Sequence, residues 1–320
     1  MWVSANRASR VLYNFLLSIE KPDVFLVPAN VCPIVLATFL KAKVSFRLVD
    51  IDQDSLCIDL IAVKDILSDS NTTFGLIFVR TFGHTGNCEA DIVSMKSQYS
   101  NLKVIIDDRC LGIPELDQTR FSEEIDMTLF STGYSKFVEL GYGGFAWLSE
   151  KYHSRYHSPQ IDYIEDAHEI LVRKFNHAIQ GRTPFNYDIE NWLDDRDLPI
   201  SLESYFSKIK SETPASLKQK STLNAIYRQA VPQELWLGEE FNLWRFSILV
   251  SNKQAVLDSI FSAGEFASSH YASMAGIFDD TTAPVAESIH SQIVNLFNDY
   301  RFTEAKAKRV AGIVKKEAKK

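Results

Sequence analysis

The sequence is poor in cysteine, and its cysteines are not grouped. The 320-residue chain contains Cys32, Cys57, Cys88 and Cys110, and no two of them form a CxxC pair. Structural zinc sites need such paired ligands, so we expect no metal. Scattered thiols, in a chain whose first residues lack the basic-then-apolar layout of a secretory signal, fit a reducing compartment. We therefore expect a cytoplasmic protein.

Long hydrophobic runs and an excess of basic charge are also missing. No apolar run approaches the roughly 20 residues that a membrane-spanning helix needs, and the formal net charge is -7. A chain with this charge has no general attraction for nucleic acid or for an anionic membrane surface. We expect neither as a partner, and a phosphorylated ligand would have to be held by local donors.

Short apolar runs alternate with helical patterns over the first 150 residues. The length and the 46% hydrophobic content allow one large domain, a smaller one and a sizeable core. Continuous apolar runs are typical of strands that are buried on both faces. We predict strands over 24–27, 44–49, 74–79, 104–106, 127–130 and 144–148, and helices over 8–19, 31–41, 60–67 and 89–99. This alternation predicts an α/β fold with a mostly parallel sheet covered on both sides.

The pattern changes after residue 150. Residues 151–235 are rich in charges and aromatics, with a helix-like pattern over 164–178. A strand over 243–250, a helix over 255–263, a strand over 293–296 and a helix over 303–316 then predict a small α+β unit. We place a large domain at 1–235, including the divergent helical segment 151–235, and a small C-terminal domain at 236–320.

Polar turns follow two of the predicted strands. Asp107 and Asp108 end the strand over 104–106, and the run from Ser131 to Lys136 follows the strand over 127–130. In open parallel sheets the ligand binds beyond the carboxyl ends of the strands, so we expect these turns to meet at a site. Gly143-Gly144 comes shortly after the lysine.

These residue types suit pyridoxal phosphate. That cofactor needs a lysine for the imine, an acid at the pyridine nitrogen, donors for the phosphate and a group against the ring face. Each residue alone has a simpler interpretation: Lys136 as an exposed turn lysine, and Asp107-Asp108 as a turn or helix cap. The combination, in this order and spacing, is more specific than any of its parts.

Several motifs resemble those of one enzyme family. Residues 27–30 (VPAN) resemble a strand-end "VPS" turn, and residues 44–52 resemble "PVFVDVD". Residues 105–108 (IIDD) stand where the family has "IEDAAQ", and Ser131 to Lys136 with Gly143-Gly144 stand where it has "SFxxxK…GGG". The chain thus resembles the fold-type I pyridoxal-phosphate enzymes of the DegT/DnrJ/EryC1/StrS family, the nucleotide-sugar aminotransferases.

The resemblance implies a fold and an assembly. It implies an aspartate aminotransferase-like architecture: a three-layer large domain with a mostly parallel seven-stranded sheet, and a small C-terminal α+β domain. It also implies a homodimer with the active site at the subunit interface.

The resemblance also implies roles for individual residues. Lys136 would form the imine with pyridoxal 5'-phosphate and shuttle protons. Asp107 would pair with the ring nitrogen, with Asp108 as the alternative if the register slips by one. Ser131 would hold the phosphate, together with the backbone amides near Ala5 and Asn6, where the family has its "GT" turn.

Some positions depart from the family pattern. Cys32 stands where the family has an aromatic against the cofactor ring, and Cys110 where it has Gln or His. We expect these two thiols beside the ring. His84 could touch the cofactor or substrate, or simply belong to a turn, and the pair His270-Tyr271 could line an interdomain cleft or pack in the core.

The predicted activity follows from the resemblance. We expect an aminotransferase that moves an amino group from an amino acid donor to a keto (nucleotide-)sugar through Lys136, as in polysaccharide biosynthesis. One alternative is a pyridoxal-phosphate enzyme with another reaction on sugars, although known dehydratases of the family replace the lysine with histidine. The other is a degenerate relative that serves in binding or regulation.

Overall fold

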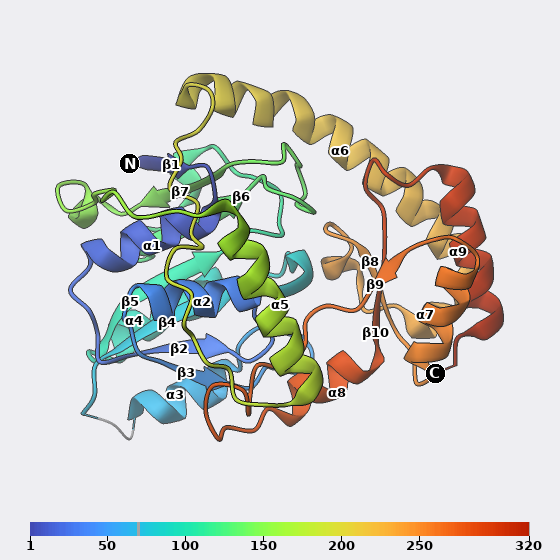
Figure 1. Cartoon of the computed structure of the whole chain (residues 1–320), viewed down its shortest axis with the longest axis horizontal. Helices are drawn as coiled ribbons and strands as arrows, with labels where there is room; N and C mark the ends of the chain where they lie inside the picture. Colours follow the sequence, from blue (N-terminus) through green and yellow to red (C-terminus); the bar gives the residue numbers. More distant parts are fainter. Residues whose placement is uncertain (69–70, 320) are drawn as a thin grey trace.

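A seven-stranded sheet forms the centre of the large unit of the molecule (Figure 1). The computed structural model describes residues 1–68 and 71–319. The strand order is β1-β7-β6-β5-β4-β2-β3, and β7 is the strand that runs antiparallel to its two neighbours. The strands are β1 (Trp2–Ala5), β2 (Val24–Pro28), β3 (Phe46–Val49), β4 (Phe74–Val79), β5 (Leu102–Asp108), β6 (Met127–Ser131) and β7 (Gly144–Leu148).

Helices cover both faces of this sheet, as the continuous apolar strands predicted. One face packs against α1 (Ala8–Ser18), α2 (Pro33–Lys41) and α5 (Glu165–Gly181). The other packs against α3 (Leu60–Ser68) and α4 (Glu89–Gln98). Because side chains alternate along a strand, Ile106 of β5 joins the α1 side and Ile105 joins the α4 side. The predicted mostly parallel, doubly covered sheet is confirmed.

The C-terminal unit contains a second, antiparallel sheet in the order β8-β10-β9. Its strands are β8 (Phe246–Leu249), β9 (Ala267–Ser268) and β10 (Ile293–Leu296). Helices α7 (Lys253–Ser262) and α9 (Glu304–Glu317) pack on it, and α8 (Pro284–Gln292) precedes β10. This unit lies to the right in Figure 1 and carries the C-terminus.

One long helix, α6 (Leu202–Ala230), runs across the top of both units in Figure 1. Near its start, Tyr205 and Ile209 pack into an aromatic cluster against β6 and β7. Near its end, Leu223 and Tyr227 belong to the core of the C-terminal unit. The helix therefore ties the two units together, and its last turns share the C-terminal core although they precede residue 236. The predicted boundary at 235/236 stays a prediction.

Some elements differ from the sequence prediction. The patterns did not indicate β1, α6, α8 or β9, which are short or largely polar, and α6 also contains Pro214. The predicted strand over 243–250 is shorter and begins at Phe246, because Trp244 lies in the loop before it. In the part of the chain that the structure describes, no helix is both long and apolar enough to cross a membrane.

Candidate functional site

A cavity of about 560 Å³ lies beyond the carboxyl ends of the parallel strands. Its size is typical of a site for a small ligand or cofactor. The cavity collects five of the predicted site residues, which come from three separate segments of the chain: Cys32, Asp108, Cys110, Ser131 and Lys136. The two predicted polar turns therefore meet at the carboxyl edge of the parallel strands, as expected for a ligand site in such a sheet.

Lys136 lies on the loop between β6 and β7 and reaches the cavity half-buried. Among the described residues, no hydrogen bond or ion pair engages its ammonium group. The preceding residue, Ser135, has a φ of 58°, a left-handed conformation that is uncommon outside glycine. The amine of Lys136 is therefore unpaired among the described residues, and the backbone that precedes it has an unusual conformation.

Asp107 and Asp108 point to opposite faces of the sheet. Asp108 lines the cavity and is 5% exposed, and its Oδ1 accepts a hydrogen bond from the Cys110 amide at 2.9 Å. Burial raises the pKa of the Asp108 carboxyl, while the hydrogen bonds from Cys110 and the charge of Lys136 act in the opposite direction. The cavity thus holds a buried carboxylate that lacks a bound cation within the described residues.

Asp107 lies outside the cavity, within a cluster of charges on the α4 side. Arg80 donates to both of its oxygens, at 3.0 Å each, and Arg109 donates from Nε at 2.7 Å. The second arm of Arg109 reaches Glu89 of α4 at 2.7 Å. Asp107 is fully buried, and its acceptor oxygens are already engaged by two arginines. This carboxylate is a structural ion-pair partner.

The start of α1 forms the end of the cavity next to Ser131. Arg7, Ala8 and Ser9 line it, and the first amides of a helix have no acceptor within the helix. Such a helix start favours an anion such as a phosphate. A Cβ added to Gly144 would lie 2.2 Å from the Ala8 nitrogen and Cα, so only glycine lets β7 approach the helix start this closely.

The predicted phosphate amides were those of Ala5 and Asn6, and the structure places both residues just outside the cavity. Ala5 pairs with Gly144 within the sheet. The Asn6 amide donates to the Arg196 carbonyl at 3.3 Å, and its side chain donates to Asp194 at 2.7 Å. The cavity lining begins one residue later, at Arg7.

Arg7 is a site residue that the sequence did not reveal. Its Nη1 donates to the Gly141 carbonyl at 2.8 Å, its Nε lies 3.6 Å from Asp194, and its guanidinium stacks over Tyr134. These partners are more than 125 residues away in the chain, so no local pattern indicates them. They hold a cation beside the helix start.

Cys32, Cys110 and Tyr271 supply the less polar walls of the cavity. Burial raises the pKa of each of these groups, which keeps the two thiols and the phenol neutral near pH 7. Tyr271 comes from the C-terminal unit, and its ring stacks on Trp244 with an interplanar angle of 14°. Of the two interpretations of His270-Tyr271, the cleft-lining one holds for the tyrosine.

His84 lies away from the cavity lining. Its ring packs against Phe241 with centroids 5.1 Å apart, and its Nδ1 is 4.0 Å from the Cys88 sulfur. Burial and the charge of Arg80 lower the pKa of the imidazole. This arrangement is that of a packed, neutral turn histidine.

The lining of the cavity fits pyridoxal phosphate. Within the part of the chain that the structure describes, it contains an amine and a buried carboxylate that form no ion pair, a hydroxyl beside helix-start amides, and neutral walls for a flat ring. Because Gly144 has no Cβ, nothing from β7 displaces the start of α1, whose first amides border the end of the cavity near Ser131. Each requirement of the cofactor has a side chain or backbone group of the right chemistry.

Comparisons with known proteins agree with this fold. No protein-family model matches the sequence, and no curated protein matches it. Among solved structures, the Helicobacter pylori aminotransferase PseC, involved in pseudoaminic acid biosynthesis, is similar with a TM-score of 0.71 and 13% identity, over 98% of this chain and 86% of that one.

Two further solved structures are similar over 98% of this chain. A DegT DnrJ EryC1 StrS aminotransferase from Brucella abortus has a TM-score of 0.65 and 16% identity, over 85% of its length. The Escherichia coli GDP-4-keto-6-deoxy-D-mannose-3-dehydratase, with bound hydrated PLP, has a TM-score of 0.66 and 14% identity, over 87% of its length. At these identities the likeness shows the fold, which is the predicted aspartate aminotransferase-like one.

Proposed function

We propose that the chain is a pyridoxal-phosphate-dependent aminotransferase that passes an amino group from an amino acid to a keto (nucleotide-)sugar. One observation carries the proposal: the free amine of Lys136 and the buried carboxylate of Asp108 face one cavity that ends at the start of α1. The similar fold of sugar aminotransferases and of a PLP-containing sugar enzyme supports the class of substrate.

Named groups of this chain would hold the cofactor. Lys136 would bond to its aldehyde carbon, and Asp108, the alternative that the sequence offered to Asp107, would pair with the ring nitrogen. Ser131, with the amides of Ala8 and Ser9, would bind the phosphate, and Arg7 adds a positive charge nearby. When bound, pyridoxal phosphate supplies an electron sink for the substrate carbon.

The electrostatics of Asp108 support its role. A buried carboxylate is unfavourable unless a cation or several donors compensate its charge. Asp108 accepts from the Cys110 amide, and burial raises its pKa. A protonated ring nitrogen would provide the missing positive partner, so the charge of Asp108 and the binding of the ring would stabilise each other.

Lys136 would also act as the acid–base group. Once its amine is released, it can hold a proton and return it at the substrate carbon, because its loop keeps it inside the cavity. The neutral thiols of Cys32 and Cys110 contribute no competing charge beside the reacting atoms.

We also propose a homodimer and a cytoplasmic location. Tyr134 is 67% exposed at the rim of the cavity, where a large aromatic side chain suits an interface. The four cysteines are all free thiols, which fits a reducing compartment. Sedimentation velocity of the purified protein tests the dimer, and a monomer at micromolar concentration would contradict it.

The reaction class is tested by amino transfer. Purified protein loaded with pyridoxal phosphate is incubated with isotopically labelled glutamate and a panel of keto-sugar nucleotides, and the products are analysed by mass spectrometry. Transfer of the labelled nitrogen to a sugar is the expected result. Loss of water from the sugar without nitrogen transfer would favour dehydration, and failure to bind pyridoxal phosphate would favour a degenerate relative.

A further inference from the structure

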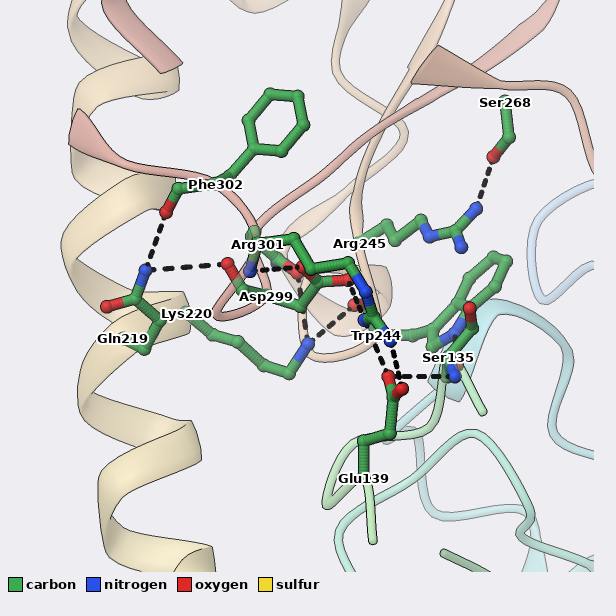
Figure 2. Close-up of polar contacts among 11 residues, drawn as sticks. Ser135, Glu139, Gln219, Lys220, Trp244, Arg245, Ser268, Asp299, Arg301 and Phe302 are labelled. Atoms are coloured by element: carbon green, nitrogen blue, oxygen red, sulfur yellow. Dashed lines mark hydrogen bonds and ion pairs between the residues drawn. The ribbon is translucent and has the colours of Figure 1, made fainter. Parts of the chain in front are cut away.

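The backbone of Ser135, the residue before Lys136, is fixed by side chains on both of its polar groups. Its amide donates to Oε2 of Glu139 at 2.9 Å, and its carbonyl accepts from Nε1 of Trp244 at 2.7 Å (Figure 2). Ser135 has the left-handed conformation that non-glycine residues avoid. One contact from within the loop and one from the C-terminal unit therefore hold the backbone of the residue that precedes Lys136.

Trp244 is itself held firmly in place. Its carbonyl accepts from Nζ of Lys220 at 2.9 Å, and the Arg245 guanidinium lies 4.3 Å from the centroid of its ring. Its ring also stacks on Tyr271, which lines the Lys136 cavity. Trp244 is 3% exposed and does not itself line that cavity. It bridges α6 and the start of β8 to the lysine loop.

Glu139 is fixed from the other side by Arg301, on the loop between β10 and α9. Arg301 donates to both oxygens of Glu139, from Nη1 to Oε2 at 2.8 Å and from Nη2 to Oε1. The loop of Arg301 is shaped by Asp299, whose Oδ1 accepts from the Arg301 amide at 3.0 Å, and by Gln219 of α6, which donates to the Phe302 carbonyl at 2.9 Å (Figure 2).

We propose that Trp244 and Arg301 are positioning residues that set the direction of Lys136, so that the placement of the C-terminal unit controls how readily this lysine reacts. This inference rests on the proposed function of Lys136. Neither residue touches the cavity in which the cofactor would bind. Both act through Ser135, Trp244 directly and Arg301 by way of Glu139.

Matched variants separate this role from general stability. Trp244→Phe removes the indole N–H but keeps an aromatic ring, and Arg301→Gln removes the bidentate contact. Trp236→Phe is a control, since Trp236 donates its N–H to the Val231 carbonyl at 3.1 Å within the C-terminal unit. Arg309→Gln is the second control, because Arg309 of α9 pairs at 3.1 Å with the buried Glu265, which is a residue of the C-terminal unit.

The first measurement is amide hydrogen exchange of the intact protein without cofactor, followed by mass spectrometry of peptides that cover residues 132–138. Loss of one hydrogen bond should speed exchange in this segment by about tenfold in Trp244→Phe and Arg301→Gln. The two control variants should exchange there like wild type. Equal exchange in all five proteins would overturn the inference whatever the protein binds.

The second measurement is the rate at which Lys136 becomes bonded to pyridoxal phosphate, trapped by borohydride and located by peptide mass. Trp244→Phe and Arg301→Gln should lower the maximal rate by about tenfold, with little change in the half-saturating concentration, because the phosphate site is intact. Arg301→Lys should recover part of the rate. If wild type is not trapped, the proposed function fails. If wild type is trapped and the variants match their controls, the positioning role fails.

Discussion

Asp107 and Asp108 are neighbours on β5, yet they lie in opposite electrostatic environments. Asp107 faces α4, where Arg80 and Arg109 neutralise it at 2.7–3.0 Å. Asp108 faces the Lys136 cavity and, within the described residues, has a backbone donor but no bound cation. The first arrangement pairs its carboxylate with two arginines, whereas the second leaves a buried carboxylate facing the cavity. An unpaired buried charge at a strand end is therefore the better indicator of function.

The largest difference should come from substituting the two aspartates separately. Asp108→Asn removes the proposed partner of the ring nitrogen, so amino transfer should fall by about 10³-fold, the scale of one preorganised electrostatic contact. Its thermal stability without cofactor should not decrease, because the substitution removes an unpaired buried charge. Steady-state kinetics and calorimetry measure the two effects.

Asp107→Asn should give the opposite result. It leaves Arg80 and Arg109 without their carboxylate, and breaking a buried pair costs about 3 kcal/mol of unfolding free energy. Urea denaturation measures this loss. The folded fraction of the Asp107→Asn protein should still bond pyridoxal phosphate at Lys136. A stable Asp107→Asn protein that does not bind the cofactor would reverse the assignment of the two aspartates.

The proposed phosphate site at the start of α1 can be tested by adding one methyl group to Gly144. Gly144→Ala places a Cβ 2.2 Å from the Ala8 nitrogen, which must displace the start of α1. Affinity for pyridoxal phosphate should fall by about tenfold or more, since overpacking costs about 1–3 kcal/mol, while affinity for pyridoxal, without phosphate, should change little. Gly112→Ala, whose Cβ would meet the Arg109 carbonyl at an ordinary 3.5 Å, is the control. Equal losses for both ligands would argue against a phosphate site there.

The comparison extends to Lys220, a buried cation that contacts no carboxylate among residues 1–68 and 71–319. It is 3% exposed, and burial lowers its pKa to about 8. The folded state therefore binds this proton less tightly than the unfolded state, so folding stability should rise as the pH rises from about 8 to above 10. The slope contributed by one such group is at most about 1.4 kcal/mol per pH unit.

The contribution of Lys220 to this pH effect is the difference between the unfolding free energies of wild type and Lys220→Met at each pH. Lys220→Met should lose the rise in unfolding free energy between pH 8 and 10, relative to wild type. Lys210→Met, an exposed position on the same helix, should keep it. Parallel curves for wild type and Lys220→Met would show that Lys220 stays protonated in the folded protein throughout this range.

The smallest effect is expected at the rim of the Asp107 cluster. Glu89 pairs with Arg109 at 2.7 Å, but both side chains are partly exposed. Glu89→Gln should lower the unfolding free energy by about 1 kcal/mol or less, because solvent screens such pairs. A loss as large as that of Asp107→Asn would mean that the cluster acts as one unit and that the buried and exposed pairs are not independent.

Much of the fold was predictable because it follows from local pattern. The apolar runs at β4, β7 and β10 have the predicted limits, and strand ends with polar residues marked the cavity. Short or polar elements such as β1 and α6 have no comparable pattern. The choice between Asp107 and Asp108 was open, since every residue of β5 from Val104 to Asp108 is buried, which hides the alternation of its faces. Arg80 and Arg7 act through distant partners, which only the folded chain brings together.

The bond between Lys136 and pyridoxal phosphate is the central element of the proposed function. Protein saturated with pyridoxal phosphate is reduced with borohydride, digested, and searched by mass spectrometry for the pyridoxyl-modified lysine, with Lys136→Ala as the comparison. We expect modification of Lys136 in wild type and in Asp107→Asn, together with a visible absorption band that Lys136→Ala lacks. Modification of another lysine, or an unchanged band in Lys136→Ala, would show that Lys136 does not bond the cofactor.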